Sequence, residues 1–452
     1  MNKTSKTALA LLMLISGAPL ALTAAPKSEA IDGRWNARLI SHDGETIPFR
    51  LDLSGSGESF KGILYDGFEP YDGTTSASFH DGALVLNIEH YLTTITASLK
   101  DGSLSGTMTS QSRAQATEYR FEATRYAPPA TASASAPSIA GSWEIPLPTP
   151  SSKGEKAFRF IVNQRGAEVA ASILRVDGDT GAYTGTYQDG KWILSHFDGS
   201  RPGVIVVVPN GDGTLSVLQH PERAERPAAA SAAAETGSKA YSDAATADGR
   251  YAAQFTAYRT EVARAKGLPE PEDYETHTTV RDPNEKFAFN FRDVDGNWVS
   301  NDDPRFKGKV VLAIVTGTWC PNCHDEAQYL VQLDKKYRDK GLAIVALDFE
   351  EPEQQGSLAR EHAFVRKYGV KYTYLIAGAP SEMWEKVPQA VNLNTWPATI
   401  FIGRDGLVKG IHSGFASPAS GEYHKQLEHE FTAKIERLLA ERPTARTASL
   451  LH

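Results

Sequence analysis

The chain has 452 residues, a length that predicts two to four domains. Hydrophobic residues make up 41% of it and charged residues 23%, as in ordinary globular proteins. The formal net charge of −8 argues against a nucleic-acid-binding surface and against an anionic-membrane surface. We therefore expect no nucleic-acid partner.

Residues 1–25 have the pattern of a secretory signal peptide. Lys3 and Lys6 precede an apolar stretch over residues 8–22, and small residues follow it at positions 23–25. The apolar stretch is too short for a comfortable transmembrane helix, and an uncleaved anchor is the alternative. We expect a mature protein without an integral membrane span, located in the periplasm or another extracytoplasmic compartment.

Residues 31–126 and 139–223 predict two tandem all-β modules, each a small barrel or sandwich. Alternating apolar and polar residues and frequent Asp-Gly turns indicate strands. The second module repeats the first, since several motifs align at a nearly constant offset. Trp35 aligns with Trp143, and both are expected to fill the ends of their cores; contact with a ligand is the alternative.

The remaining segments outside the C-terminal domain connect the modules or end the chain. Residues 127–138 are a Pro/Ala/Ser linker, and residues 224–250 are an Ala-rich linker. Residues 251–272 predict a connecting helix that packs on the C-terminal domain. Its apolar side chains recur at helical spacing: Tyr251, Phe255, Tyr258 and Val262. Residues 443–452 predict a disordered tail.

Residues 273–442 alternate between strand and helix patterns, which predicts an α/β domain with a mostly parallel sheet covered on both faces. The apolar run 309–316 predicts a central strand, and residues 321–337 predict the first helix. Both cysteines of the chain, Cys320 and Cys323, lie at this junction in the sequence Trp-Cys-Pro-Asn-Cys. A Cys-x-x-Cys pair there is typical of thiol–disulfide redox proteins.

The two cysteines differ in their expected roles. Cys320 lies at the helix N-terminus, where free N–H groups stabilise a thiolate, so we expect it to be the exposed nucleophile. Cys323, one turn later, is expected to be shielded and to resolve a mixed disulfide. His324 and Asp325 are expected at the surface, although His324 could tune the thiolate. A zinc site would need a second ligand pair, so we expect no metal, and we expect no cofactor.

The C-terminal domain resembles the thioredoxin superfamily, specifically the exported TlpA/ResA-type thiol–disulfide reductases. The resemblance rests on the Trp-Cys-x-x-Cys junction and on Glu326, three residues after the second cysteine. It also rests on an insertion that includes residues 353–378 and on the Trp396-Pro397 step before an edge hairpin. It covers a little over a third of the chain and neither β module.

The resemblance implies roles for the residues around the cysteines, which would form a Cys320–Cys323 disulfide when oxidised. Glu326 would relay the Cys323 proton, with a pKa raised by burial, against the alternative of a solvated carboxylate. Trp319 would shield the motif and shape the docking surface, against the alternative of plain core packing. Pro397 would be cis and present the Trp396 backbone to a substrate strand, against the alternative of a trans proline.

The sequence thus predicts two tandem all-β modules followed by a thioredoxin-like domain, in an extracytoplasmic oxidoreductase that reduces the disulfides of client proteins. The resemblance implies re-reduction by a membrane electron donor. One alternative is a dithiol oxidase or isomerase; another is an adaptor whose β modules recruit a partner. The Pro-Asn pair does not decide the direction, because Cys-x-x-Cys potentials span about 150 mV.

Overall fold

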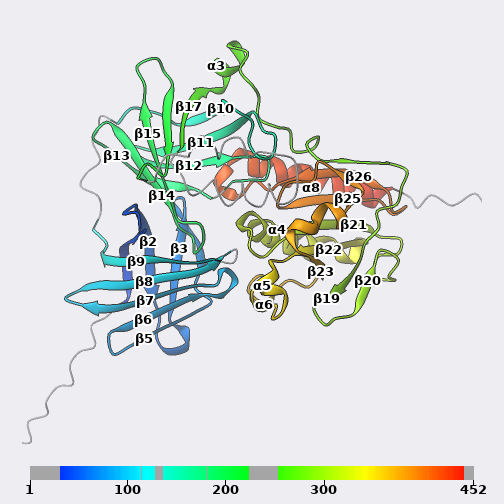
Figure 1. Cartoon of the computed structure of the whole chain (residues 1–452), viewed down its shortest axis with the longest axis horizontal. Helices are drawn as coiled ribbons and strands as arrows, with labels where there is room; N and C mark the ends of the chain where they lie inside the picture. The colour runs from blue at the N-terminus through cyan, green and yellow to red at the C-terminus, as the bar shows by residue number, and fades with distance from the viewer. Residues whose placement is uncertain (1–30, 113–114, 128–135, 180, 223–252, 442–452) are drawn as a thin grey trace, which may run out of the picture.

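The computed structural model describes residues 31–112, 115–127, 136–179, 181–222 and 253–441. The expected signal peptide, the Ala-rich linker 224–250 and the expected tail 443–452 lie outside the described residues. The described part of the chain folds into two all-β modules and one thioredoxin-like α/β module, which confirms the predicted fold class (Figure 1). Within these residues, no helix combines the length and the apolar character that crossing a membrane requires.

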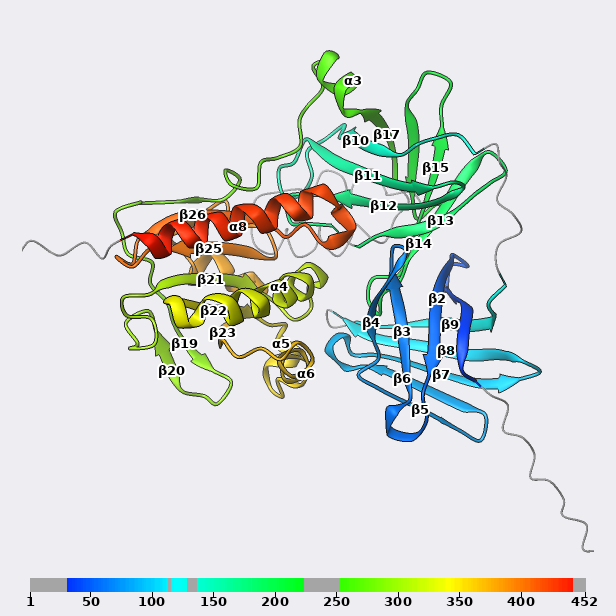
Figure 2. The ribbon, with the colours of Figure 1, turned by 180° about the vertical axis from the view of Figure 1, so that it is seen from behind.

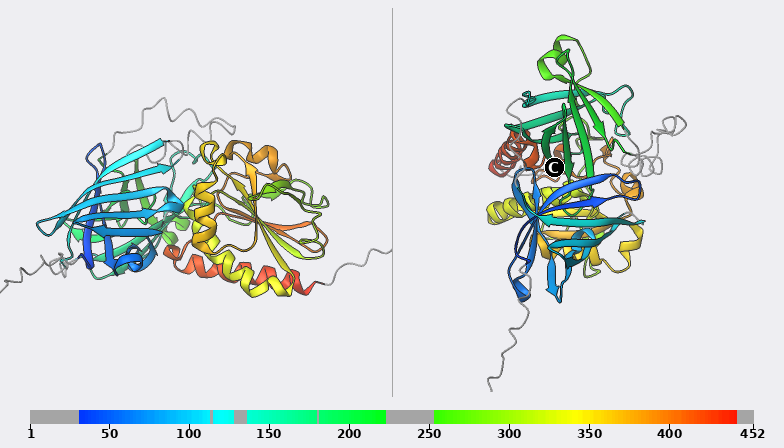
Figure 3. Two further views of the ribbon diagram at one scale, coloured as in Figure 1. Left: turned by 90° about the horizontal axis from the view of Figure 1, so that it is seen from below. Right: turned by 90° about the vertical axis from the view of Figure 1, so that its left-hand side faces the viewer.

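The first module is a nine-stranded antiparallel sheet in the order β4-β3-β2-β1-β9-β8-β7-β6-β5. Its elements are β1 (Gly33–Ile40), β2 (Thr46–Ser54), η1 (Gly57–Ser59), β3 (Lys61–Asp66), β4 (Glu69–Gly73), β5 (Ser76–His80), β6 (Ala83–Ile88), η2 (Glu89–Tyr91), β7 (Thr93–Lys100), β8 (Ser103–Ser112) and β9 (Gln115–Arg125). Edge strands β4 and β5 follow each other in the chain, so the sheet curls and brings its two edges near each other (Figure 3). Its concave face holds the core, as the alternating pattern predicts.

The second module is a closed antiparallel barrel of strands β10 to β17. Its elements are β10 (Gly141–Pro146), β11 (Ala157–Arg165), β12 (Glu168–Leu174), β13 (Tyr183–Gln188), β14 (Lys191–His196), β15 (Gly203–Pro209), β16 (Leu215–Gln219), β17 (Ala253–Arg259) and the appended α3 (Thr260–Ala265). Strand β17 pairs with both β16 and β10. The last strand of the barrel therefore comes from beyond the Ala-rich linker.

The prediction of a connecting helix over 251–272 is wrong for the residues that form β17. Only Thr260–Ala265 is helical. The side chains also fit a strand, because Phe255 and Ala257 turn toward the barrel core while Gln254 and Thr256 are exposed. Pairing this segment between β16 and β10 satisfies backbone groups that would otherwise form two open edges. The linker thus interrupts the second module instead of following it.

Matching tryptophans show the duplication in three dimensions. Trp35 and Trp143 are 0% and 3% exposed, and each indole N–H donates to a carbonyl oxygen four residues earlier, at 3.0 and 2.8 Å. Arg125 and Arg259 place their guanidinium groups 4.1 and 3.9 Å from the respective ring centroids. Both tryptophans are therefore part of their module cores, as predicted. Because Arg125 ends β9 and Arg259 ends β17, these strands correspond in the repeat.

The thioredoxin-like module contains a seven-stranded sheet in the order β20-β19-β23-β22-β21-β25-β26. Its strands are β18 (Thr279–Val280), β19 (Asn290–Asp293), β20 (Trp298–Ser300), β21 (Val310–Thr316), β22 (Leu342–Phe349), β23 (Thr373–Gly378), β24 (Ala390–Val391), β25 (Ala398–Ile402) and β26 (Val408–Ser413). Its helices are α4 (Pro321–Tyr337), η3 (Arg338–Lys340), α5 (Pro352–Gln355), α6 (Ala359–Tyr368), η4 (Pro380–Glu382), α7 (Met383–Lys386), η5 (Pro418–Ser420) and α8 (Glu422–Ala440). Strands β21, β22 and β23 are parallel, and β18 pairs with β24 as a separate ribbon.

Central strand β21 is buried along its whole length. Leu312 and Ile314 face a core built with α4, α6 and α8, whereas Val311 and Ala313 face a second core on the opposite side of the sheet. A parallel strand covered on both faces needs this continuous apolar sequence. It fixes the start of α4 and thereby the position of the cysteines.

The three modules pack against one another, with the two β modules stacked and the thioredoxin-like module beside both (Figure 1, Figure 2). Between the β modules, the rings of Phe49 and Phe197 lie 4.8 Å apart. Nearby, His220 Nδ1 lies 3.1 Å from the carboxylate of Glu45. The N-terminal part of α4 and the residues around η5 face the β modules, so the redox pair lies at a module boundary.

Candidate active site

The two cysteines lie where the chain passes from β21 into α4. Cys320 is the N-cap residue of α4, and Pro321 occupies the first helical turn, where its missing N–H is not needed. Both cysteines are free thiols in the structure. The Cys320 thiol donates to the carbonyl oxygen of Trp396 at 3.3 Å. The nucleophile thus faces the loop that the sequence analysis paired with it.

The two thiols differ in the direction in which their pKa values are shifted. Burial acts to raise the pKa of Cys320, but the hydrogen bond from Cys323 and the positive charges of Arg201 and Lys153 bring it below its ordinary value. Burial raises the pKa of Cys323 well above its ordinary value, and Cys320 raises it further. The structure therefore favours a thiolate at Cys320 and a protonated thiol at Cys323, which matches their expected roles.

The expectation of an exposed nucleophile is wrong for this conformation. Cys320 is 2% exposed and Cys323 is 1% exposed. The second β module covers them: the Asn322 side chain, between the cysteines, donates to the carbonyl oxygen of Asp177 at 2.8 Å. The covering residues lie more than a hundred positions earlier in the chain, so no local pattern could reveal them.

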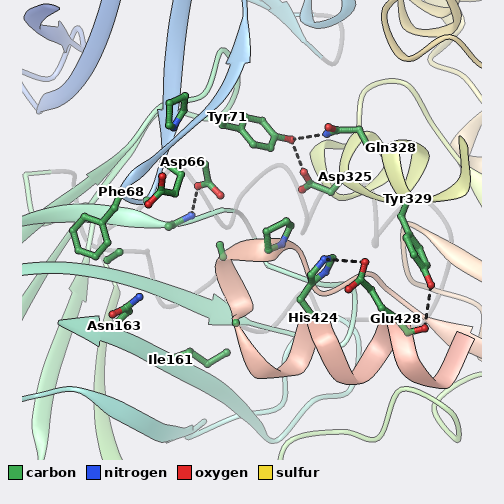
Figure 4. A pocket seen from close by; sticks show the side chains of 18 of the residues that line it. Asp66, Phe68, Tyr71, Ile161, Asn163, Asp325, Gln328, Tyr329, His424 and Glu428 are labelled. Carbon is green, nitrogen blue, oxygen red and sulfur yellow. Dashed lines mark hydrogen bonds and ion pairs between the residues drawn. The ribbon is translucent and has the colours of Figure 1, made fainter. Parts of the chain in front are cut away.

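His324 and Asp325 are also covered, contrary to the expectation that they lie at the surface. The His324 ring is fully buried, 4.3 Å from the ring of Tyr91 in the first module. The hydroxyl of Tyr71 donates to Asp325, and this hydroxyl also accepts from Gln328 at 3.3 Å (Figure 4). The first module therefore packs on α4 directly after the cysteines.

Glu326 lies behind the pair on α4 and is only 1% exposed, so it is not a solvated carboxylate. The Thr399 hydroxyl donates to its Oε1 at 2.5 Å. The pKa of Glu326 is raised to about 8. Burial is the main cause and the charge of Cys320 adds to it, whereas the hydrogen bond from Thr399 acts to lower the pKa. Glu326 in turn contributes to the raised pKa of Cys323. A carboxyl group that titrates near neutral pH suits proton relay.

Glu326 should make stability depend on pH. Its pKa is about 8 when folded, against an ordinary value of 4.5, so the folded chain retains a proton that the unfolded chain loses in this range. The free energy of unfolding should therefore fall as pH rises from about 4.5 to 8. Glu326→Gln should flatten this fall and be the more stable protein at the upper end. Urea unfolding at both ends measures it, with exposed Glu422→Gln as control; equal slopes for Glu326→Gln and wild type would contradict it.

The aromatic wall of the site combines Trp319 with the loop before β25. The rings of Trp319 and Trp396 meet edge to face at 5.1 Å, and the Trp319 indole N–H donates to the carbonyl oxygen of Phe349 at 2.9 Å. The Trp396–Pro397 peptide bond is cis, the isomer that the sequence predicts. Trp319 and Trp396 are both buried here and belong to the core of the domain, which is the packing alternative; a shielding role for Trp319 stays a prediction.

A seam between the barrel and the thioredoxin-like module lies beside the cysteines. Gly178 forms a β-bridge with Phe415, and a side chain at Gly178 would put its Cβ only 2.1 Å from the Phe415 carbonyl oxygen. Next to it, Asp179 accepts from the Ser417 backbone N–H at 2.9 Å, from the Ser417 hydroxyl at 2.6 Å and from the Ser420 hydroxyl. We call residues 176–179 together with 414–420 the seam.

Sequence reasoning missed the seam and the β-module residues near the cysteines. One signal was available in the repeat. The connection between β12 and β13 runs from residue 175 to 182, whereas its counterpart between β3 and β4 is residues 67–68. A longer loop in one copy of a duplication indicates an added contact, but it does not identify the segment that the loop contacts.

A cavity of about 410 Å³ lies at the junction of all three modules (Figure 4). Residues of each module line it, among them Asp66 and Tyr71 from the first, Asn163 from the second, and Asp325 and His424 from the third. Neither cysteine is among its lining residues. The cavity is therefore a gap in the packing around α4 and is separate from the space around the thiols.

The site contains a reduced Cys-x-x-Cys pair at a helix N-terminus. A central parallel strand precedes the pair, and a cis-proline loop faces it. These features define a dithiol protein of thioredoxin-like fold. Residues 281–411 match the AhpC/TSA family. The thiol-disulfide oxidoreductase ResA of Bacillus thuringiensis subsp. konkukian (strain 97-27) is 30% identical over 143 residues, which cover 32% of this chain and 72% of the relative. The chain thus belongs to the ResA/TlpA-type thiol–disulfide oxidoreductases of the thioredoxin superfamily, through its C-terminal domain.

Further comparisons each cover a minor part of this chain. The ResA of Bacillus thuringiensis (strain Al Hakam) is 32% identical over 116 residues, covering 26% of this chain and 60% of the relative. The chain thus spans 60% of the length of that relative. A solved structure of a putative thiol:disulfide interchange protein DsbE from Chlorobium tepidum is 21% identical, with a TM-score of 0.27; the match covers 34% of this chain and 98% of that one.

Proposed function

We propose that this protein is an extracytoplasmic oxidoreductase that reduces disulfides in client proteins. The observation that carries the proposal is the Cys320 thiol, whose pKa is lowered and which faces the Trp396 carbonyl, with Cys323 and buried Glu326 behind it. The extracytoplasmic location is supported by the sequence of residues 1–25, and the family supports the redox chemistry.

The proposed reaction has two exchanges. The Cys320 thiolate attacks one sulfur of the client disulfide, whose S–S bond breaks, and the departing client sulfur takes up a proton. Glu326 then accepts the Cys323 proton, and the Cys323 thiolate attacks the Cys320 sulfur of the mixed disulfide. The client leaves as a dithiol, having gained two electrons, and this protein is left with a Cys320–Cys323 disulfide. A membrane electron donor, the second proposed partner, would return the two electrons.

The reduction potential of the full-length chain tests the direction of transfer. Equilibration with defined glutathione ratios, read by mass change after thiol labelling, should give a value near the reducing end of the Cys-x-x-Cys range, about −270 mV. A value near −120 mV would instead identify a dithiol oxidase and overturn the reductase proposal.

Glu326→Gln should slow the second exchange near neutral pH, because the amide cannot accept the Cys323 proton. We expect roughly a hundredfold or larger loss in resolution rate, with the first attack unchanged. Stopped-flow decay of a preformed mixed disulfide measures the second exchange alone. Unchanged decay in Glu326→Gln would remove Glu326 from the mechanism.

A further inference from the structure

Lys153 of the second module reaches the redox site across the module boundary. Its ammonium pairs with the carboxylate of Asp177, and its side chain is only 11% exposed. The backbone carbonyl oxygen of Lys153 accepts a hydrogen bond from the side-chain amide of Asn394 at 3.4 Å. Asn394 lies two residues before Trp396, whose carbonyl oxygen accepts from the Cys320 thiol. The Asp177 carbonyl accepts from Asn322, between the cysteines, at 2.8 Å. Lys153 thus contacts the loop before Trp396 through its own carbonyl, and the loop that holds the cysteines through its ion-pair partner Asp177.

We propose that Lys153 is a positioning residue of the redox site, whose ammonium stabilises the Cys320 thiolate from outside the thioredoxin fold. The proposal rests on the redox function proposed above and assigns part of that site to the β barrel. In a site closed to water, opposite charges attract more strongly than at the surface, because little solvent screens them.

Several charged or titratable groups share this site. They comprise Lys153, Glu155, Arg175, Asp177 and Arg201 from the second module, and Cys320, Cys323 and Glu326 from the thioredoxin-like module. Burial lowers the pKa of Lys153, and Arg175 and Arg201 lower it further, whereas Glu155 and Cys320 favour its charged form. The ion pair with Asp177 also favours the ammonium.

Arg201, also of the second module, lowers the pKa of Cys320 more than Lys153 does, but the two residues are not equivalent. Arg201 is exposed, so solvent and salt screen its charge. Lys153 is held at the covered side by an ion pair and a backbone hydrogen bond. We therefore assign the salt-resistant part of the thiolate stabilisation to Lys153.

Three full-length variants test the assignment, each in a Cys323→Ser background so that a single thiol titrates. Lys153→Gln removes the cation and should raise the Cys320 thiol pKa by about one pH unit, a tenfold change in its ionisation equilibrium. Asp177→Asn removes the carboxylate that pairs with the Lys153 ammonium and should lower the Cys320 thiol pKa. Lys156→Gln, at an exposed position of the same loop, should leave it unchanged. The ultraviolet absorbance of the thiolate, followed against pH, gives each value.

Opposite shifts in Lys153→Gln and Asp177→Asn would establish the electrostatic role. Shifts in the same direction would mean that the loop has loosened, and no shift in Lys153→Gln would mean that the ammonium does not act on Cys320; either overturns the proposal. The titration needs no client. A protein that shows the opposite shifts but reduces no disulfide would therefore contradict the proposed function alone.

Discussion

Replacing Cys320 with serine should reduce disulfide turnover to background, because a serine hydroxyl is not ionised at neutral pH and does not attack sulfur. Cys323→Ser should behave differently: the first attack proceeds, but no second thiol releases the client. Mixed disulfides should then accumulate through Cys320. Non-reducing electrophoresis and intact mass measurement distinguish the two variants.

The same experiment identifies clients when it is carried out in cells that express the Cys323→Ser variant. The double variant Cys320→Ser, Cys323→Ser is the matched control, since it keeps the fold and lacks both thiols. Covalent adducts in Cys320→Ser, with none in Cys323→Ser, would reverse the assigned roles. They would also conflict with the lowered pKa of Cys320 and the raised pKa of Cys323.

Removing the Asp179 carboxylate should expose the redox pair. Asp179→Ala deletes the acceptor for three hydrogen bonds from Ser417 and Ser420, which join the barrel to the thioredoxin-like module. Hydrogen bonds to a charged group contribute roughly 1.5–3 kcal/mol each, although neighbouring bonds are not additive. A net loss of about 1.5–3 kcal/mol from the closed arrangement would increase the open population about tenfold to a hundredfold.

The rate at which a bulky maleimide labels Cys320 reports this opening, since the thiol is 2% exposed in the closed arrangement. We expect labelling to accelerate in proportion to the open population. Asp212→Ala is the matched control, because Asp212 is a barrel aspartate whose hydrogen bonds stay within its own turn, to Thr214. Equal labelling rates in Asp179→Ala and wild type would show that the seam does not control access to the thiol.

Local sequence was sufficient to predict the centre of the site. The strand before Cys320 and the helix after it follow from residues adjacent in the chain, whereas the cis Trp396–Pro397 bond was implied by the family resemblance. The burial of Glu326 was implied only by the resemblance to the TlpA/ResA-type reductases, because its position one turn beyond Cys323 is equally compatible with a solvated carboxylate. The strand and the helix depend on short-range backbone geometry and on apolar periodicity, which a single sequence records directly.

The surroundings of the site could not be predicted in this way. Asp177 and Asp179 contact residues far along the chain, and their own sequence is that of an ordinary polar turn. The segment that forms β17 has apolar residues compatible with both periods, and only the unpaired edges of β10 and β16 decide between them. Contacts between distant parts of the chain, which the local pattern does not encode, determined both the seam and the strand conformation of β17.

The position of β17 also sets an order of events during synthesis. The first module is complete once residue 125 has emerged, whereas the barrel cannot close until residues 253–259 are available. Until then β10 and β16 are open edges that can pair with another chain. Once β17 is in place, the thioredoxin-like module follows directly, beginning next to the surface it will cover. A nascent chain halted just after residue 222 should therefore be more prone to aggregation than one halted after residue 266.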